Sequence, residues 1–232
     1  MSAPLVKPVL PPYAIAPRPG STSWWTGDHT QLAYHHPGDP LPHFVSRRAV
    51  LSAEQCRLLI DCFERCRESC SARDTDEYWA GRFIWQNFLP DSETAALRLM
   101  QQLRSLSLIL LYQAFRPERP VYSDTAQLVR WHEGLELTPH VDNMEPDGRP
   151  NNTCHRSFAS ICYLNDDYEG GETYFPGHGV RIKPTPGALI VFGAGLEYVH
   201  GVSRITRGMR YTYAGWFTHE SALEDTNAPR IF

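Results

Sequence analysis

The chain has 232 residues, of which 42% are hydrophobic, and a formal net charge of −4. This length suits one substantial core, and the sequence contains no apolar run long enough to span a membrane. The mild negative charge and the lack of any lysine or arginine run leave no electrostatic footprint for nucleic acid or an anionic membrane surface. We therefore expect neither nucleic acid nor a membrane as a partner.

Residues 1–50 are rich in proline and aromatic side chains, and we expect an N-terminal extension that packs partly on the core. Prolines recur from Pro4 to Pro19 and would interrupt the apolar segment of a signal peptide, which favours a cytoplasmic protein. Residues 51–232 are expected to form a single domain.

Two helices are predicted at the start of this domain. Ser52 and Gln55 form a capping box, in which each side chain bonds the other residue's backbone N–H, and an apolar stripe follows. A second helix is predicted from Pro90 to about Tyr112. Between them, Tyr78–Phe88 is aromatic and has the composition of a strand.

Three cysteines follow one another at helical spacing in the first helix: Cys62, Cys66 and Cys70. Their spacing matches no zinc-binding pattern. We interpret them as reduced thiols that pack on one face of the helix.

The second half of the chain is dominated by short strands separated by glycine, proline and asparagine turns, a pattern typical of a jelly-roll barrel. We therefore predict a mainly β protein of the α+β class, with helices flanking the sheets. The strands are predicted at Ala126–His132, Leu137–Asp142, Phe158–Leu164, Glu172–Phe175, Val180–Ile182, Ala188–Phe192, Glu197–His200 and Arg210–Thr218.

His140 and Asp142 lie two residues apart on a predicted strand, so both side chains leave the same face. His200 on a distant strand would complete a set of two histidines and one carboxylate, the facial triad of non-haem Fe(II) oxygenases, which leaves coordination positions open. A lone His-x-Asp occurs often by chance. The residues after His200 therefore decide how the pair is interpreted.

Arg210 follows His200 by ten residues, beyond a turn that contains Gly208. A guanidinium there can hold a carboxylate through two parallel hydrogen bonds, and the Thr212 hydroxyl points to the same side. An isolated arginine on a late strand is more often a surface residue. Together with the three candidate ligands, Arg210 indicates an anchor for the distal carboxylate of 2-oxoglutarate.

From about residue 128 to about residue 218 the sequence resembles the Fe(II)/2-oxoglutarate dioxygenases of the prolyl hydroxylase superfamily. The resemblance rests on His-Val-Asp-Asn at 140–143, Cys-Tyr-Leu-Asn-Asp-Asp at 162–167, Glu-Gly-Gly-Glu-Thr at 169–173 and the His-to-Arg spacing. Within the superfamily, these motifs are most similar to the prolyl 3-hydroxylase (leprecan) catalytic domain.

This resemblance implies a double-stranded β-helix over residues 51–232, with Fe(II), 2-oxoglutarate and O2 as cofactors and ascorbate as a candidate reductant. It assigns the iron to His140, Asp142 and His200, and 2-oxoglutarate to Arg210. It also implies that Tyr163, Thr212 and Trp131 contact the cosubstrate.

The expected reaction is the hydroxylation of an unactivated C–H bond with O2, giving succinate and CO2. The resemblance suggests peptidyl or free proline, or a related cyclic amino acid, as the substrate. In the related enzymes the segments matching Arg73–Trp79 and Asn143–Arg156 flank the barrel mouth, so Trp79 and Arg156 are candidate substrate contacts.

Three alternatives stay open at this point. The first is a tailoring hydroxylase that acts on a small molecule in a biosynthetic pathway. The second is a jelly-roll binding protein without catalytic activity, which the intact ligand set and Arg210 disfavour. The third is a zinc hydrolase, which could use two histidines and an aspartate but would not need Arg210.

Overall fold

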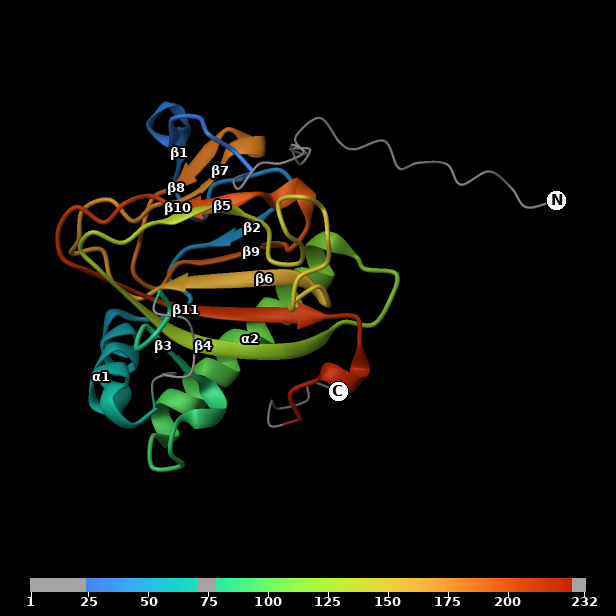
Figure 1. Cartoon of the computed structure of the whole chain (residues 1–232). Helices are drawn as coiled ribbons and strands as arrows, with labels where there is room; N and C mark the ends of the chain where they lie inside the picture. Colours follow the sequence, from blue (N-terminus) through green and yellow to red (C-terminus); the bar gives the residue numbers. More distant parts are fainter. Residues whose placement is uncertain (1–23, 71–77, 227–232) are drawn as a thin grey trace.

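The computed structural model describes residues 24–70 and 78–226, and two β-sheets form the centre of the molecule (Figure 1). One sheet has five strands in the order β1-β8-β7-β10-β5, and the other has six in the order β2-β9-β6-β11-β4-β3. The predicted jelly roll, a double-stranded β-helix of mainly β character, is confirmed. The N-terminal residues up to Ser23 and the segment 71–77, which includes Arg73, lie outside the described residues.

The strands are β1 (Ala33–His35), β2 (Val45–Arg47), β3 (Phe83–Trp85), β4 (Tyr122–His132), β5 (Leu137–His140), β6 (Arg156–Tyr163), β7 (Thr173–Phe175), β8 (Val180–Ile182), β9 (Leu189–Gly193), β10 (His200–Val202) and β11 (Met209–Thr218). The helices are α1 (Ala53–Cys70) and α2 (Thr94–Phe115), with single 3-10 turns at His29–Gln31, Gln86–Phe88, Pro176–His178, Leu196–Tyr198 and Ser221–Leu223.

Helix α1 begins as its sequence predicts. The Gln55 N–H donates to Ser52 Oγ at 3.2 Å, and the Ser52 N–H donates to Gln55 Oε1 at 2.8 Å, which completes the capping box. In Figure 1, α1 and α2 lie on the same side of the six-stranded sheet, and their apolar faces share one core cluster with residues of β6, β9 and β11. Within the described ranges, no helix combines the length and apolar character needed to cross a membrane.

Strict alternation along β6 and β11 separates this outer core from the space between the sheets. Cys162 and Tyr213 point toward the helices, whereas Tyr163, Thr212 and Ala214 point inward. Because β6 pairs with β11 and β11 pairs with β4, the inward side chains of these three central strands form one continuous wall. This wall carries much of the candidate site.

Several sequence predictions need correction. Strands β1 and β2 were not expected; each is only three residues long, too short for a periodic pattern, and they are held by pairing with β8 and β9. Only Phe83–Trp85 of the aromatic segment forms a strand, and a 3-10 turn follows it. Residues 196–198 also form a 3-10 turn, so β10 begins at His200. The division of the chain near residue 50 stays a prediction.

Candidate functional site

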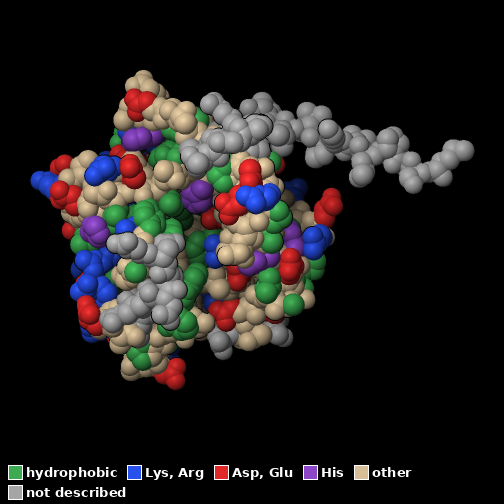
Figure 2. All heavy atoms as spheres, viewed as in Figure 1, with side chains coloured by type: hydrophobic (Ala, Val, Ile, Leu, Met, Phe, Trp, Pro, Cys, Tyr) green, Lys and Arg blue, Asp and Glu red, His purple; other side chains and the backbone are tan. Residues whose placement is uncertain are grey.

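A cavity of about 500 Å³ lies between the two sheets, and residues from both of them line it. Figure 2 shows hydrophobic side chains gathered around a hollow in the middle of one face of the molecule. Eight of the nine candidate site residues line this cavity: Trp79, Trp131, His140, Asp142, Arg156, His200, Arg210 and Thr212. The ninth, Tyr163, is fully buried next to Arg210.

The three candidate metal ligands meet inside this cavity. His140 ends β5 and His200 begins β10, and the antiparallel register of these strands puts the two residues opposite each other, with ring centroids 4.3 Å apart. Asp142 Oδ1 lies 3.9 Å from His140 Nε2. One donor atom from each of the three residues lies within 4.8 Å of the others. The side chains of His140 and Asp142 therefore do meet that of the distant His200.

Backbone carbonyl groups fix the orientation of both imidazole rings. His140 Nδ1 is 3.1 Å from the Thr138 carbonyl, and His200 Nδ1 is 2.9 Å from the Tyr198 carbonyl. Because a carbonyl can only accept, each Nδ1 carries a proton and donates it, which leaves Nε2 as the ring nitrogen that could bind a metal. Burial, followed by the neighbouring charge of His200, lowers the pKa of His140 to about 4, so its ring is neutral at neutral pH.

The backbone of Asp142 is held by the loop that follows it. Its N–H donates to the Ala194 carbonyl at 3.1 Å. Its own carbonyl accepts from Asn151 Nδ2 at 3.2 Å and from Thr153 Oγ1 at 2.6 Å. Sequence reasoning missed Asn151 and Thr153, because polar residues in a long loop give no signal of what they contact. The loop 143–155 thus fixes a candidate ligand as well as covering the cavity.

Arg210 lies at the other end of the inward wall, with 2% of its surface exposed. It donates to Thr173 Oγ1 at 3.2 Å and to Thr212 Oγ1 at a long 3.5 Å, and its buried Nε has no hydrogen-bond partner. None of the ion pairs among the described residues includes Arg210. A buried cation without an anionic partner is costly, so this guanidinium calls for an anion from outside the chain.

Phenol rings surround Arg210. The guanidinium carbon lies 5.5 Å from the centre of the Tyr163 ring, whose hydroxyl donates to Thr173 Oγ1 at 2.8 Å. Sequence reasoning missed Tyr168, whose buried hydroxyl has no hydrogen-bond partner. Burial raises the pKa of Tyr168 and the charge of Arg210 opposes this shift. Trp131, buried in the cavity wall, pairs in register with Arg210.

Arg156 and Trp79 lie in the aromatic part of the cavity. The Arg156 guanidinium stacks on the ring of Trp216, 3.9 Å from its centre, and its Nε lies 3.7 Å from Asp124 Oδ2. Burial lowers the pKa of Arg156. Trp79 packs edge-on against Trp131, with centroids 5.6 Å apart. Both candidate substrate contacts therefore face the cavity.

Comparison with known proteins identifies the segment that carries this site. Residues 126–218, from β4 to the end of β11, match the model of the 2OG-Fe(II) oxygenase superfamily. This matched segment, 93 of the 232 residues, is similar to that superfamily. Its resemblance to the prolyl hydroxylase type is confirmed, and the superfamily implies Fe(II), 2-oxoglutarate and O2 as cofactors.

Two curated relatives show how far the sequence similarity extends. Human prolyl 3-hydroxylase 3 is 32% identical over 148 residues, which cover 55% of this chain and 20% of the human protein. Rat prolyl 3-hydroxylase 2 is 37% identical over 91 residues, which cover 34% of this chain and 13% of the rat protein. The chain thus matches a fifth or less of the length of these relatives.

Solved structures of this superfamily share the fold. A prolyl 4-hydroxylase from Pseudomonas putida is 20% identical, with a TM-score of 0.58 over 77% of this chain and 94% of its own. A prolyl hydroxylase from Trichoplax adhaerens, solved with a peptide fragment of the hypoxia-inducible factor, is 16% identical, with a TM-score of 0.60 over 76% of this chain and 84% of its own. At these identities the similarity shows the fold alone.

Proposed function

We propose that the chain is a 2-oxoglutarate-dependent hydroxylase that oxidises an unactivated C–H bond of proline, peptidyl or free, or of a related cyclic amino acid. In this proposal His140, Asp142 and His200 hold Fe(II), and Arg210 holds the distal carboxylate of 2-oxoglutarate. The observation that carries the proposal is the combination of three converging donor atoms with a buried cation that has no anionic partner, both in one cavity.

The side chains fit the cofactors that the superfamily implies. Two imidazoles whose Nδ1 atoms donate to backbone carbonyls, together with one carboxylate, suit iron(II) and leave coordination positions open. At the other end, the Arg210 Nε and the Tyr168 hydroxyl are buried donors that lack partners. Each is an unsatisfied group that a bound carboxylate would satisfy.

Iron with 2-oxoglutarate and O2 supplies the oxidising power, since decarboxylation of the cosubstrate to succinate and CO2 accompanies the insertion of one oxygen atom into the C–H bond. The protein holds the two reactants in place. The backbone carbonyls of Thr138 and Tyr198 orient the imidazoles, and Asn151 and Thr153 hold the Asp142 backbone. Rigid support of this kind keeps all three ligands directed to one point.

Arg210 orients the cosubstrate. Thr173 and Thr212 fix its guanidinium, and the rings of Tyr163 and Trp131 exclude water from its surroundings. In such a dry environment the attraction between the guanidinium and a carboxylate is stronger than in water. This arrangement would select a cosubstrate that carries a second carboxylate.

The aromatic part of the cavity is proposed to bind the substrate. Its rings, which include Trp79, Phe83, Trp85 and Trp216, can bury an apolar ring such as that of proline. Arg156 adds hydrogen-bond donors beside these rings. The names of the relatives, prolyl 3-hydroxylases, support proline as the substrate class. We also propose, from the sequence alone, that ascorbate is the reductant and that the protein is cytoplasmic.

A tailoring hydroxylase for a small molecule is the second candidate. The observation that favours it is the size of the cavity, about 500 Å³, which falls within the range of sites that bury small ligands. A zinc hydrolase remains a poorer fit, because a hydrolytic site has no use for the unpaired charge of Arg210.

The test is to load the full chain with Fe(II) and supply 2-oxoglutarate and O2 with either free proline or proline-containing peptides. Substrate-dependent succinate formation together with a product heavier by one oxygen atom would support the proposal. Modification of free proline alone would favour a hydroxylase that acts on a small molecule. Modification of the peptides alone would favour a hydroxylase of peptidyl proline. A complete lack of succinate with every substrate, in protein shown to bind iron, would overturn the assignment.

A further inference from the structure

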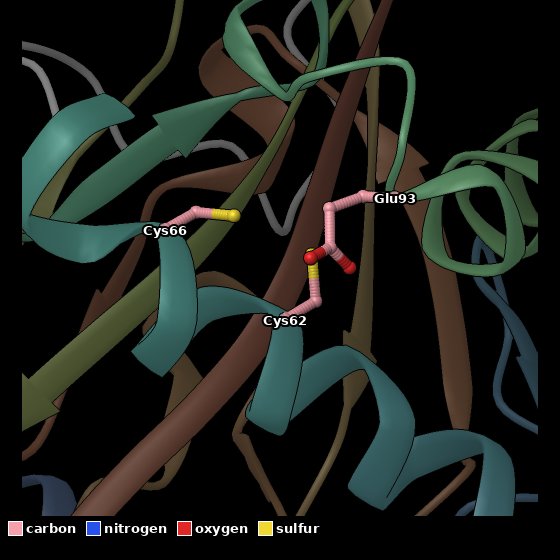
Figure 3. A group of neighbouring side chains, drawn as sticks. All are labelled: Cys62, Cys66 and Glu93. Atoms are coloured by element: carbon pink, nitrogen blue, oxygen red, sulfur yellow. The ribbon is translucent and has the colours of Figure 1, made fainter.

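A second group of candidate ligands lies outside the cavity, between α1 and the start of α2. It consists of Cys62 and Cys66 on α1 and Glu93, the residue that precedes α2. One donor atom from each of the three residues lies within 4.8 Å of the others. In Figure 3, Cys62 points toward the Glu93 carboxylate, and Cys66 projects from the next turn of α1 toward the same space.

Burial and charge make this group unusual. Cys62 is fully buried and Cys66 is 5% exposed, so two buried thiols lie beside a partly exposed carboxylate. Arg65 holds that carboxylate from the outside, with Nε 3.1 Å from Oε1 and NH2 2.7 Å from Oε2. Burial, followed by the charge of Glu93, raises the pKa of the Cys62 thiol, while the hydrogen bonds from Arg65 lower the pKa of Glu93. The metal-free group therefore holds the neutral thiol of Cys62 beside an ionised carboxylate.

We propose that Cys62, Cys66 and Glu93 form a binding site for a thiophilic divalent cation of the zinc class. The two cysteines lie four residues apart on one helix, so their side chains reach the same spot, and a third donor arrives from another element. Thiolate and carboxylate oxygen are both ligands of zinc, and three protein ligands leave one tetrahedral position for water.

The distances and charges fit such an ion. Donor atoms bound to tetrahedral zinc at about 2.0–2.3 Å stand roughly 3.3–3.8 Å apart, so closing the present group requires about 1 Å of movement, within reach of side-chain rotation. Two thiolates and one carboxylate carry three negative charges, which Arg65 and a divalent cation together would balance. The two thiol protons leave to solvent when the ion binds, so no oxidant or reductant is needed.

A cation at this position would join α1 to the start of α2, the two helices that cover the six-stranded sheet. Binding to the folded chain alone would stabilise it by mass action. The role is structural, it is independent of the proposed hydroxylase activity, and it adds a second metal to a chain whose other candidate site has only nitrogen and oxygen donors.

The experiment is a titration of the reduced full chain with Cd²⁺, followed by the ultraviolet charge-transfer band of cadmium thiolate. The nitrogen and oxygen donors of His140, Asp142 and His200 cannot give this band, so the two sites are distinguished. We expect a band in the wild-type chain that saturates at one Cd²⁺, disappears in Cys62→Ser and in Cys66→Ser, and weakens in Glu93→Gln. Cys56→Ala is the matched control, because Cys56 is equally buried on α1 but lies outside the group; it should keep the band.

Two measurements on the wild type keep the test independent of how well the variants fold. Release of about two protons per Cd²⁺ in weakly buffered solution, and two sulfur neighbours in the X-ray absorption spectrum of the bound ion, are expected. No thiolate band in the wild type, or a band that survives in the folded Cys62→Ser/Cys66→Ser double variant, would overturn the site. Either result would leave the hydroxylase proposal untouched.

Discussion

Two arginines, the buried Arg210 and the partly buried Arg156, line the same cavity and differ in how their charge is balanced. Arg210 donates to two threonine hydroxyl groups and lies beside the ring of Tyr163, and it takes part in none of the ion pairs among the described residues. Arg156 has Asp124 3.7 Å from its Nε and stacks on Trp216. Asp124 is itself shared with His155, whose Nε2 lies 3.1 Å from the same oxygen.

The difference predicts different ligands. An uncompensated buried guanidinium gains most from a ligand that brings a full negative charge, as 2-oxoglutarate does. A guanidinium already beside a carboxylate gains less from a second charge and offers its N–H groups as donors to neutral acceptors, such as an amide carbonyl. We infer that Arg210 acts through charge and Arg156 through hydrogen bonds. The candidate metal ligands line the same cavity, so one metal ion would act on both the cosubstrate at Arg210 and the substrate at Arg156.

Removing the metal ligands tests whether the proposed reactions of the cosubstrate and of the substrate depend on one metal ion. In His140→Ala, Asp142→Ala and His200→Ala, two protein ligands remain, and we expect substrate-dependent succinate formation to fall below detection. Circular dichroism should show an unchanged fold, since all three side chains face the cavity. Retained turnover in His200→Ala would show that the third ligand is assigned wrongly.

Replacing Arg210 tests the charge at the proposed 2-oxoglutarate site. Truncating one partner of a desolvated charged pair costs about 2–5 kcal/mol. Arg210→Ala should therefore raise the 2-oxoglutarate requirement by at least about 30-fold. Arg210→Gln should do nearly as much harm, because it keeps donors but removes the charge.

Binding without turnover can be measured by the thermal shift that 2-oxoglutarate produces in protein loaded with Mn²⁺, a metal used here as an inactive substitute. The shift should disappear in both Arg210 variants and remain in Arg156→Ala. A normal shift in Arg210→Gln would mean that 2-oxoglutarate binding does not depend on the charge of Arg210. The proposed difference between Arg210 and Arg156 would then be wrong.

Replacing Arg156 tests the aromatic part of the cavity. Hydrogen bonds from a charged donor contribute about 1.5–3 kcal/mol, so Arg156→Ala should weaken apparent substrate binding about 10-fold or more while the 2-oxoglutarate requirement stays the same. Arg156→Gln should recover much of the loss, unlike the matching change at Arg210. Steady-state kinetics with each substrate varied separately separates the two effects. Equal damage from Ala and Gln would assign Arg156 a charge-dependent role.

The sequence was most informative where one strand or one fixed spacing carries the chemistry. The hydroxyl of Thr212 accompanies Arg210 because strand geometry has a period of two. The two-residue spacing of His140 and Asp142 also predicted that both line the cavity, although β5 ends at His140 and Asp142 lies in the turn that follows. The capping box at Ser52 likewise needs only four consecutive residues. Local rules of this kind can be applied without knowing the fold.

Contacts made across the fold were not predictable in the same way. Asn151 and Thr153 hold Asp142 through a loop whose path depends on tertiary packing, and Tyr168 reaches Arg210 from a turn. The balancing of Arg156 by Asp124 joins residues of different strands, β6 and β4. Strands β1 and β2 exist because β8 and β9 offer them pairing partners. A three-residue segment carries no periodic pattern that would reveal such pairing.

The smallest expected effect concerns how Arg210 is held. Thr212 Oγ1 accepts from Arg210 at 3.5 Å, at the limit of hydrogen-bond distance, whereas Thr173 Oγ1 accepts at 3.2 Å and also receives the Tyr163 hydroxyl. Thr212→Val keeps the shape and removes this weak acceptor, at a cost of about 0.5–1 kcal/mol. The 2-oxoglutarate requirement should therefore rise about 2- to 5-fold, and apparent substrate binding should not change.

Thr173→Val is the matched comparison for Thr212→Val, because it removes an acceptor shared by Arg210 and Tyr163 in a fully buried position. Loss of a shared buried acceptor leaves two donors unsatisfied, so its effect on the 2-oxoglutarate requirement should exceed that of Thr212→Val. If Thr212→Val instead matched Arg210→Ala, the hydroxyl would have to contact the cosubstrate directly. The cavity would then bind 2-oxoglutarate through Thr212 as much as through the charge of Arg210.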